Sequence, residues 1–232
     1  MNHIRPVFLK LALTASMLLW ASIAVTPATA ATFLYSFTGV VDKVQGQLNP
    51  PFFVNGLNPP AMSASMTVES APDLDTNPNH RFGEYKITSF NLHIDNSNSG
   101  GYNATKGTFN QLEIRDGTPG RDQLNVAVIA PNGDPVGARA PSLFDIKLHS
   151  SDTNTFASDA LPTTAPSIGN FDKKNIWRLV FEPGGKAVSG YITAMSITAV
   201  PLPAAVILFG AGLVALVGLG AGSWRRKSNS LA

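Results

Sequence analysis

The feature that most constrains this chain is an alternation of apolar and polar residues that recurs through its middle. It is cleanest in MSASMTVES (62–70), where methionine, alanine and valine alternate with serine, threonine and glutamate. A period of two places every second side chain on the same face of a strand. This stretch therefore predicts a half-buried β-strand with one wet face, and no segment between 31 and 200 shows a sustained helical period.

Further strands are predicted by similar patterns, separated by turns rich in Gly, Pro and Asn. The apolar residues of 90–95 have the opposite parity to Tyr85 and Ile87, which predicts a β-bulge near Ser89. Pro183-Gly184-Gly185 predicts a hairpin turn between the last two strands. The expected strands are 32–41, 62–70, 90–95, 107–115, 123–130, 143–149, 175–182 and 186–198.

This spacing of short strands predicts an all-β fold, namely a single antiparallel domain over 31–199 of the β-sandwich or jelly-roll type. The chain contains no cysteine, so the fold must rely on its apolar core rather than on disulfides. A domain of about 170 residues buries close to 70% of its unfolded surface, which is enough for such a core.

The first thirty residues have the layout of a secretory signal peptide. A basic start in 1–10 precedes an apolar region at 11–25, and the small residues Ala28 and Ala30 precede Ala31. Residues 1–30 are therefore predicted to be a signal peptide that is cleaved after Ala30, and the mature chain is predicted to be exported.

The end of the chain predicts a membrane span. Residues 204–223 contain no charge, and about 20 apolar residues are what a helix needs to cross a bilayer. The basic cluster Arg225, Arg226 and Lys227 follows and predicts a cytoplasmic C-terminus. The expected topology is a transient inner-membrane anchor, with the N-terminal side out and the C-terminal side in.

The charge balance changes once these terminal segments are set aside. The whole chain has 17 basic and 15 acidic residues, and five of the basic ones lie in the two terminal segments. All the acidic residues lie between 31 and 200, so that part has a net charge of −3. The basic overall balance is thus no evidence for nucleic-acid binding.

The stretch Val200-Pro201-Leu202-Pro203-Ala204, followed by a glycine-rich apolar run and the basic cluster, resembles the PEP-CTERM sorting signal in its VPLPA variant. Such tails are carried by exported proteins of Gram-negative bacteria that make exopolysaccharide. The resemblance implies recognition of residues 200–232 by an exosortase, a membrane-embedded enzyme similar to cysteine transpeptidases. It implies cleavage near the Pro-x-Pro and transfer or release to the cell surface or matrix. Leu202 departs from the name-giving motif, which has glutamate there.

Parts of the exported region also resemble domains found upstream of such tails. The matching pieces are DTNPNHRFGEY with ITSFNLHID, then SDALPTTAP, and GGKAVSGYIT. This resemblance implies an exported β domain, and it brings no catalytic residue with it.

The stretch DLDTNPNHRFGE (73–84) has the spacing of a calcium loop. Asp73, Asp75 and Asn77 stand at positions 1, 3 and 5, Asn79 at position 7, and Glu84 at position 12. Position 6 holds proline instead of glycine, and the neighbours are predicted strands rather than helices. The alternative is an ordinary Asx-rich turn without metal.

Catalytic patterns are not found, so no enzyme is expected. There is no Gly-x-Ser-x-Gly, and the histidines His80, His93 and His149 are scattered, the last two on the outward parity of their strands. Paired carboxylates for glycoside hydrolysis would have to come from acids that sit at turns or on outer faces. These acids are Glu113, Asp116, Asp122 and Glu182.

The pattern favours a non-enzymatic structural or adhesive protein of the cell surface or exopolysaccharide matrix. The alternative is a carbohydrate-binding module, assisted by calcium, and an unidentified hydrolase comes third. The candidate sugar-binding aromatics are Tyr102, Trp177 and Tyr191, of which Trp177 shares the parity of Leu179 and Phe181 and so favours the core. No cofactor other than this calcium ion is expected.

Overall fold

The computed structural model describes residues 31–48, 52, 59–70, 81–95, 101–117, 120–201, 209 and 212. These residues form one antiparallel sheet and two short 3-10 helices, η1 (Gly46–Leu48) and η3 (Ile168–Asn170). The strands, in chain order, are β1 (Thr32–Val44), β2 (Ala61–Glu69), β3 (Phe82–Ile94), β4 (Tyr102–Thr105), β5 (Phe109–Arg115), β6 (Gln123–Ile129), β7 (Asn132–Gly133), β8 (Ala140–His149), β9 (Lys174–Glu182) and β10 (Lys186–Val200).

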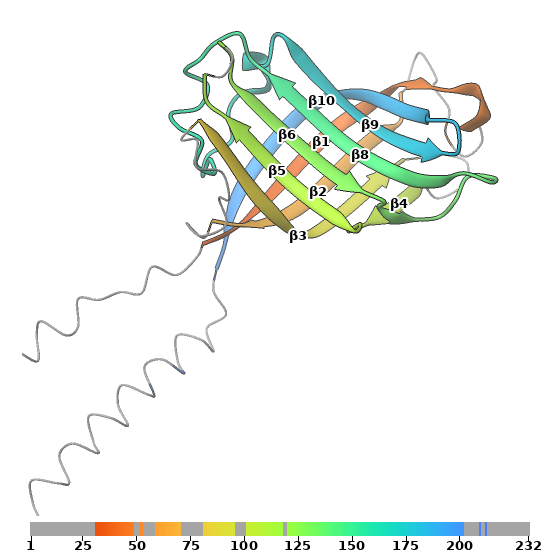
Figure 1. The fold of residues 1–232 in the computed structure, drawn as a ribbon, viewed down its shortest axis with the longest axis horizontal. Coiled ribbons are helices and arrows are strands. Elements are labelled where there is room, and N and C mark those ends of the chain that lie inside the picture. The colour runs from red at the N-terminus through yellow and green to blue at the C-terminus, as the bar shows by residue number, and fades with distance from the viewer. Residues whose placement is uncertain are drawn as a thin grey trace, which may run out of the picture.

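The sheet closes on itself into a barrel (Figure 1). Eight strands follow one another around the wall in the order β2-β1-β10-β9-β8-β6-β5-β3, and β3 then pairs with β2. This closing pair runs from Met62 opposite Ile94 to Val68 opposite Ile87. The short strands β4 and β7 continue the sheet beside the second half of β3.

The predicted β-sandwich is therefore wrong, and the fold is a closed barrel. Alternation determines which side chains face inward, and both architectures bury one face of every strand. The difference lies in the pairing of β2 with β3, which leaves these two strands without a free edge. That long-range pairing leaves no mark on the local pattern of either strand.

The predicted strands themselves are confirmed, with bounds that differ by up to three residues except that β3 begins eight residues before the predicted strand 90–95. The strands β4 and β7 were not predicted. The bulge near Ser89 is also confirmed, because Thr67 pairs with Ser89 while Val68 pairs with Ile87, which leaves Thr88 as the extra residue. The predicted turn at Pro183-Gly184-Gly185 joins β9 to β10, and both glycines have positive φ.

The barrel interior is filled with large apolar side chains. An eight-stranded barrel has an interior about wide enough for side chains to fill. Trp177 is fully buried, and its indole Nε1–H donates to the carbonyl oxygen of Val40 at 3.1 Å. A Cβ atom at Gly190 would clash with that same carbonyl oxygen, so the close approach of β10 to β1 at this position requires glycine. Other fully buried large residues are Tyr35, Phe37, Met62, Met66, Phe90, Phe144 and Phe181.

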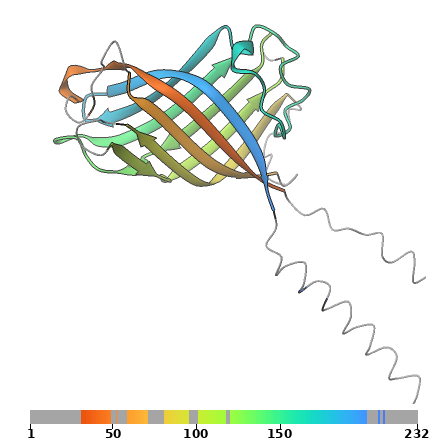
Figure 2. The same cartoon turned by 180° about the vertical axis from the view of Figure 1, so that it is seen from behind.

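One end of the barrel is covered by the β8–β9 connection at 150–173, which lies at the end from which residues 31 and 201 emerge (Figures 1 and 2). The hydroxyl of Tyr35 donates to Pro162 O at 2.7 Å, and that of Tyr85 donates to Asp159 O at 3.0 Å. Apolar side chains of the connection, among them Phe156, are buried beneath it. These contacts fix the connection as a cap.

The fully buried carboxylate of Asp122 joins this cap to the β5–β6 turn. It accepts hydrogen bonds from the backbone N–H groups of Gly117 and Phe156, each at 2.7 Å. Because the two donors lie far apart in sequence, this one side chain holds two loops against each other.

In the part of the chain that the structure describes, no helix is long and apolar enough to cross a membrane. This finding contradicts the predicted C-terminal membrane helix and the transient inner-membrane anchoring that depended on it. The prediction had rested on the apolar length of 204–223 alone. Of the stretch 204–223, only Phe209 and Gly212 belong to the described residues.

Candidate functional site

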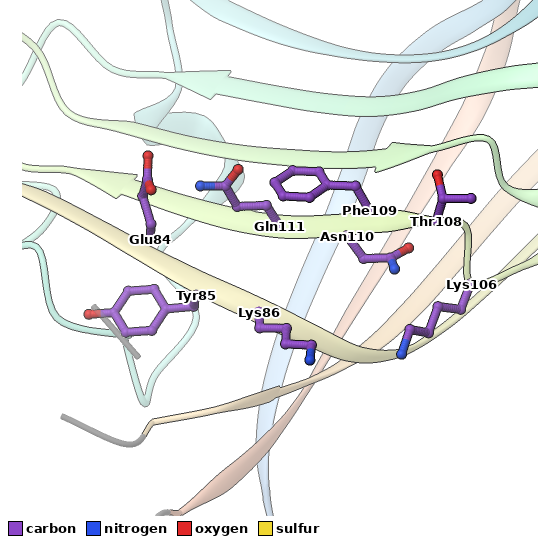
Figure 3. Close-up of a pocket in the computed structure, with 8 residues that line it drawn as sticks. All are labelled: Glu84, Tyr85, Lys86, Lys106, Thr108, Phe109, Asn110 and Gln111. Carbon is purple, nitrogen blue, oxygen red and sulfur yellow. The ribbon is translucent and has the colours of Figure 1, made fainter. Parts of the chain in front are cut away.

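A groove of about 520 Å³ lies where β3 changes its partner (Figure 3). β3 pairs with β5 through Phe82–Lys86 and with β4 through Asn91–Ile94. Between these ladders the β4–β5 connection runs through 106–108, so the wall is indented there. The lining residues are Glu84, Tyr85, Lys86, Lys106, Thr108, Phe109, Asn110 and Gln111.

The β4–β5 connection is held rigidly by Asn110, which is only 8% exposed. Its Oδ1 accepts from Gly107 N at 2.9 Å, and its Nδ2 donates to Gly107 O at 3.0 Å. Thr108 N donates to Ile129 O at 2.9 Å, and a Cβ at Gly107 would clash with that oxygen. The residues on either side, Lys106 and Phe109, are therefore presented on a fixed turn.

Two lysines supply positive charge to the groove. Lys86 and Lys106 are exposed, and neither forms an ion pair within the described residues. Glu84 lies at the opposite end of the groove from Lys106 (Figure 3). The groove thus has a cationic end and an acidic end, which gives it a direction for a charged ligand.

Phe109 provides an aromatic surface beside the lysines. Its side chain is 50% exposed although it lies on a strand of a fully packed barrel. It pairs across the sheet with Ile129, which is 45% exposed, and Ile129 pairs with Leu143. An exposed ring that lines the same groove as two ammonium groups can stack on an apolar ring face while the cations bind an anionic substituent.

The groove lacks the groups that two-carboxylate hydrolysis needs. Among its described lining residues, Glu84 is the single carboxylate, and it pairs opposite Glu113 on β5. Glycoside hydrolysis by the usual route needs two acids on either side of the bond to be cleaved. What the groove offers is binding by charge, stacking and hydrogen bonding.

The carboxylates considered for catalysis have structural partners instead. Glu113 binds Arg115 through both oxygens, one of them to Nη2 at 2.9 Å. Asp122 is buried under the cap, and Glu182 accepts from Gly185 N at 2.9 Å in the β9–β10 turn. Burial is the first cause that raises the pKa of Asp116, followed by the negative charge of Asp122.

The outward histidines differ from each other. His93 lies 2.8 Å from Asn103 Oδ1 and 3.0 Å from Asp95 Oδ1, and these hydrogen bonds raise its pKa. His149 Nε2–H donates to Asn125 Oδ1 at 3.0 Å. Burial, together with nearby cations, lowers the pKa of His149 to about 4, so it is neutral at pH 7. His80 lies outside the described residues.

The aromatic candidates separate in the same way. Trp177 and Tyr102 are 0% and 5% exposed and belong to the core, whereas Tyr191 on β10 is 48% exposed. Tyr102 packs at the end of the barrel opposite the β8–β9 connection, against Phe52 and Phe181, with ring centroids 5.1 and 5.7 Å away. Only Tyr191 of the three is accessible to a ligand.

The calcium loop cannot be assembled from the described residues. Asp73, Asp75, Asn77 and Asn79 lie outside them, and Glu84 alone is placed, on β3. The described His, Asp and Glu side chains include no group of three or more that could hold a metal. Calcium binding at 73–84 stays a prediction.

The sorting motif begins where the barrel ends. Val200 is the last residue of β10 and pairs with Thr32, and Pro201 follows it. Outside the described residues lie Leu202, Pro203, Ala204, Arg225, Arg226, Lys227, Ala28 and Ala30. Ala31 is described, and its carbonyl accepts from Ser70 N at 2.9 Å. Signal cleavage and recognition by an exosortase therefore stay predictions.

Sequence reasoning missed the lysines and Phe109. A signal for Phe109 was present, because Asn110, Leu112 and Ile114 occupy the inward parity of β5 and place Phe109 among the outward residues. An aromatic residue on the wet parity of a strand has no packing explanation. Lys86 and Lys106 gave no such signal, since their proximity depends on the change of partner along β3.

Comparison with protein-family models, with curated proteins and with solved structures finds no match to this chain. The groove and the outer surface of the barrel are therefore the basis on which a function can be proposed.

Proposed function

We propose that this protein is a non-catalytic carbohydrate-binding protein, and that the groove between β3, β4 and β5 holds an acidic saccharide. The observation that carries the proposal is the combination of an exposed Phe109 with two ammonium groups that have no ion-pair partner among the described residues. A uronic acid has the matching features, because its ring presents an apolar C–H face and its carboxylate is an anion.

The lysines supply the preference for an acidic sugar. An ammonium group binds a carboxylate through a charge-assisted hydrogen bond, which is about twice as strong as a neutral one. At an exposed site each such contact is worth roughly 0.2–1 kcal/mol and weakens with salt. The affinity for one sugar unit is accordingly modest, and a polymer gains strength by making several contacts at once.

The neutral groups supply the orientation. The rings of aromatic residues have a negative face that attracts C–H groups, so Phe109 favours a sugar lying flat on it. Thr108 and Gln111 flank the ring with a hydroxyl and an amide that can bond sugar hydroxyls. The side-chain amide of Asn110 is hydrogen-bonded to Gly107, so it fixes the shape of the loop and does not bind the ligand.

The test is calorimetric titration of the full-length chain with a galacturonic acid hexamer, with maltohexaose as the neutral comparison. The double variant Lys86→Gln/Lys106→Gln should weaken binding of the acidic hexamer by roughly 5- to 30-fold, which corresponds to about 1–2 kcal/mol. Phe109→Ala should weaken it by a similar factor because the stacking surface is lost.

Matched controls are available on the rest of the barrel. Lys43→Gln/Lys186→Gln removes the same charge away from the groove, and Tyr191→Ala removes an equally exposed aromatic ring. Neither control should change the affinity by more than about twofold. Equal binding of the hexamer by the wild type and the groove variants, or equal binding of maltohexaose, contradicts the proposal.

A structural or adhesive role is the second candidate. The row formed by Phe109, Ile129, Leu143 and Val180 favours it, because these apolar side chains face outward in direct cross-strand register. This role requires that copies of the protein associate with each other in the absence of any saccharide. Sedimentation velocity measures this association. Concentration-dependent association that Phe109→Ala abolishes supports adhesion, and a monomer at all concentrations favours carbohydrate binding.

A further inference from the structure

A second set of cations crosses the barrel wall at the capped end. Arg115 on β5 pairs with Gln123 on β6, Gln123 with His149 on β8, and His149 with Lys174 on β9. Neighbouring strands lie about 4.8 Å apart, so this row spans roughly 14 Å across the strands. Arg121 precedes the first residue of β6 by two positions and lies beside the row.

Two of these cations are available to a ligand. Arg121 and Lys174 are exposed, and neither forms an ion pair within the residues that the structure places. Arg115 is engaged, because it binds Glu113 and its guanidinium lies 4.0 Å from the Phe82 ring centre. The row therefore presents free positive charge at two points, with His149 between them.

The cations around His149 act on it electrostatically. After burial, the causes that lower its pKa are the cations of Lys174, Arg121, Lys147 and Arg115. Two of these cations have carboxylate partners, because Glu113 binds Arg115 and Asp145 lies 3.4 Å from Lys147. Lys174 and Arg121, which form no ion pair among the described residues, therefore supply the positive charge that a ligand can meet.

We propose that the row of Arg115, His149 and Lys174, with Arg121 beside it, is a second binding surface for the same acidic polysaccharide, so that one polymer chain contacts both the groove and the row. This inference rests on the proposed function for the class of its ligand. Phe109 in the groove and Arg115 in the row are the two ends of β5, which are about 20 Å apart at 3.4 Å per residue.

The geometry favours a polymer over a small anion. The cations of the row lie on neighbouring strands of the sheet and do not converge on one point. A polyanion can place one carboxylate near Lys174 and another near Arg121, and then reach the groove along β5. Once one carboxylate of the polymer is bound, the rest of the polymer is held near the surface. Its effective concentration for each further contact is therefore raised.

The experiment compares four forms of the full-length chain for binding of a galacturonic acid dodecamer. These are the wild type, the groove variant Lys86→Gln/Lys106→Gln, the row variant Arg121→Gln/Lys174→Gln, and the control Lys43→Gln/Lys186→Gln. The row variant should lose about 5- to 10-fold in affinity for the dodecamer and less than twofold for a galacturonic acid dimer. The control should stay within twofold of the wild type.

The imidazole of His149 gives an independent readout by NMR. A bound polyanion offsets the field of the cations, so the pKa of His149 should rise from about 4 when the dodecamer binds. It should stay unchanged with the dimer. An unchanged His149 together with an unaffected row variant overturns this inference, even if the groove variant fails to bind.

The reverse result separates the two proposals. Loss of affinity in the row variant with no loss in the groove variant supports the row and contradicts the groove. A single-stranded DNA of the same charge that binds as tightly as the dodecamer shows a general polyanion surface, which overturns the assignment to a polysaccharide. Equal losses in the row variant and the control show an effect of net charge only and also overturn it.

Discussion

The two halves of the barrel wall have equally apolar inner surfaces and very different outer ones. On β5, β6, β8 and β9 (Figure 1), the outer side chains form a charged face. Its members are Glu113, Arg115, Asp145, Lys147, His149, Lys174 and Arg178. On β1, β2 and the second half of β3 (Figure 2), they form a hydroxyl face. Its members are Ser36, Thr38, Ser63, Ser65, Thr67, Thr88, Ser89 and Asn91.

The comparison shows that the inward side chains of a strand determine the fold, while its outward side chains determine the chemistry of the surface. The inward residues of both halves bury apolar area and determine the barrel, so they carry little information about function. The outward residues can vary freely between ion pairs and neutral hydroxyls. Stability on the charged face should therefore depend on pH and salt, while on the hydroxyl face only the His93–Asp95 pair at the end of β3 should respond to either.

The largest effect is expected from Asp145, which faces outward on β8 yet is only 3% exposed because cations cover it. Arg178 Nε donates to its Oδ1 at 3.0 Å, and Lys147 lies 3.4 Å from its Oδ2. Asp145→Asn should lower the free energy of unfolding by about 2–3 kcal/mol, because the carboxylate partner of a covered ion pair is removed. Urea unfolding measures this loss.

The matched comparison is Ser65→Ala on the hydroxyl face, which should cost less than about 0.5 kcal/mol. A cycle with Arg178→Met separates the pair energy from the effect of each single change. If Asp145→Asn is as mild as Ser65→Ala, the charged face contributes no more to stability than the hydroxyl face.

His149 should give the charged face a dependence on pH. Its folded pKa of about 4 lies below the ordinary value of 6.5, so the unfolded chain takes up the proton first. Stability should be constant above about pH 7 and fall as the pH drops from 6.5 towards 4. The loss should be about 1–2 kcal/mol, since each pKa unit corresponds to about 1.4 kcal/mol and the partly exposed group is screened.

Thermal melts of the wild type and His149→Gln between pH 4 and 7 measure this dependence. Glutamine can keep a hydrogen bond to Asn125 without titrating, so the variant should have a flatter profile. Identical slopes for the two proteins would mean that acid sensitivity arises elsewhere in the barrel.

A smaller effect than at Asp145 or His149 is expected for Thr67, at the bulge of the hydroxyl face. Its Oγ1 lies 2.9 Å from Thr88 Oγ1 and 2.5 Å from Ser89 Oγ. Thr67→Val should cost about 1 kcal/mol, because the hydrogen bonds are lost while the shape is kept. Urea unfolding at low and high salt should give the same difference, and a clear salt dependence would contradict the neutral character of this face.

Much of the fold was readable from the sequence because alternation is a local property. Met62 to Val68 displayed it directly, and the parity change between Ile87 and Phe90 located the bulge before Ser89. Closure of the barrel could not be predicted. It depends on the pairing of β3 with β2 through seven residue pairs, and the local pattern of each strand would fit another partner equally well. Nor was β4, whose four residues are too short for a pattern.

Less of the candidate site than of the fold could be predicted from the sequence. Lys86 and Lys106 are 20 positions apart and come together only because β3 exchanges β5 for β4 along its length. Motif reasoning instead singled out 73–84, and among its described residues, 81–84, Glu84 lines the groove. Sequence spacing finds ligands that one loop supplies, and it misses surfaces that several strands assemble.

The pairing of the first strand with the last has a mechanical consequence. Thr32 lies opposite Val200, so the ends of β1 and β10 leave the barrel side by side from the capped end. A force that pulls residues 31 and 201 apart acts at one end of this antiparallel ladder and opens its hydrogen bonds one pair after another, like a zipper. Such an opening resists much less force than the shearing of all pairs at once. The barrel can therefore bear tension applied through a ligand on its wall better than tension applied between its two ends.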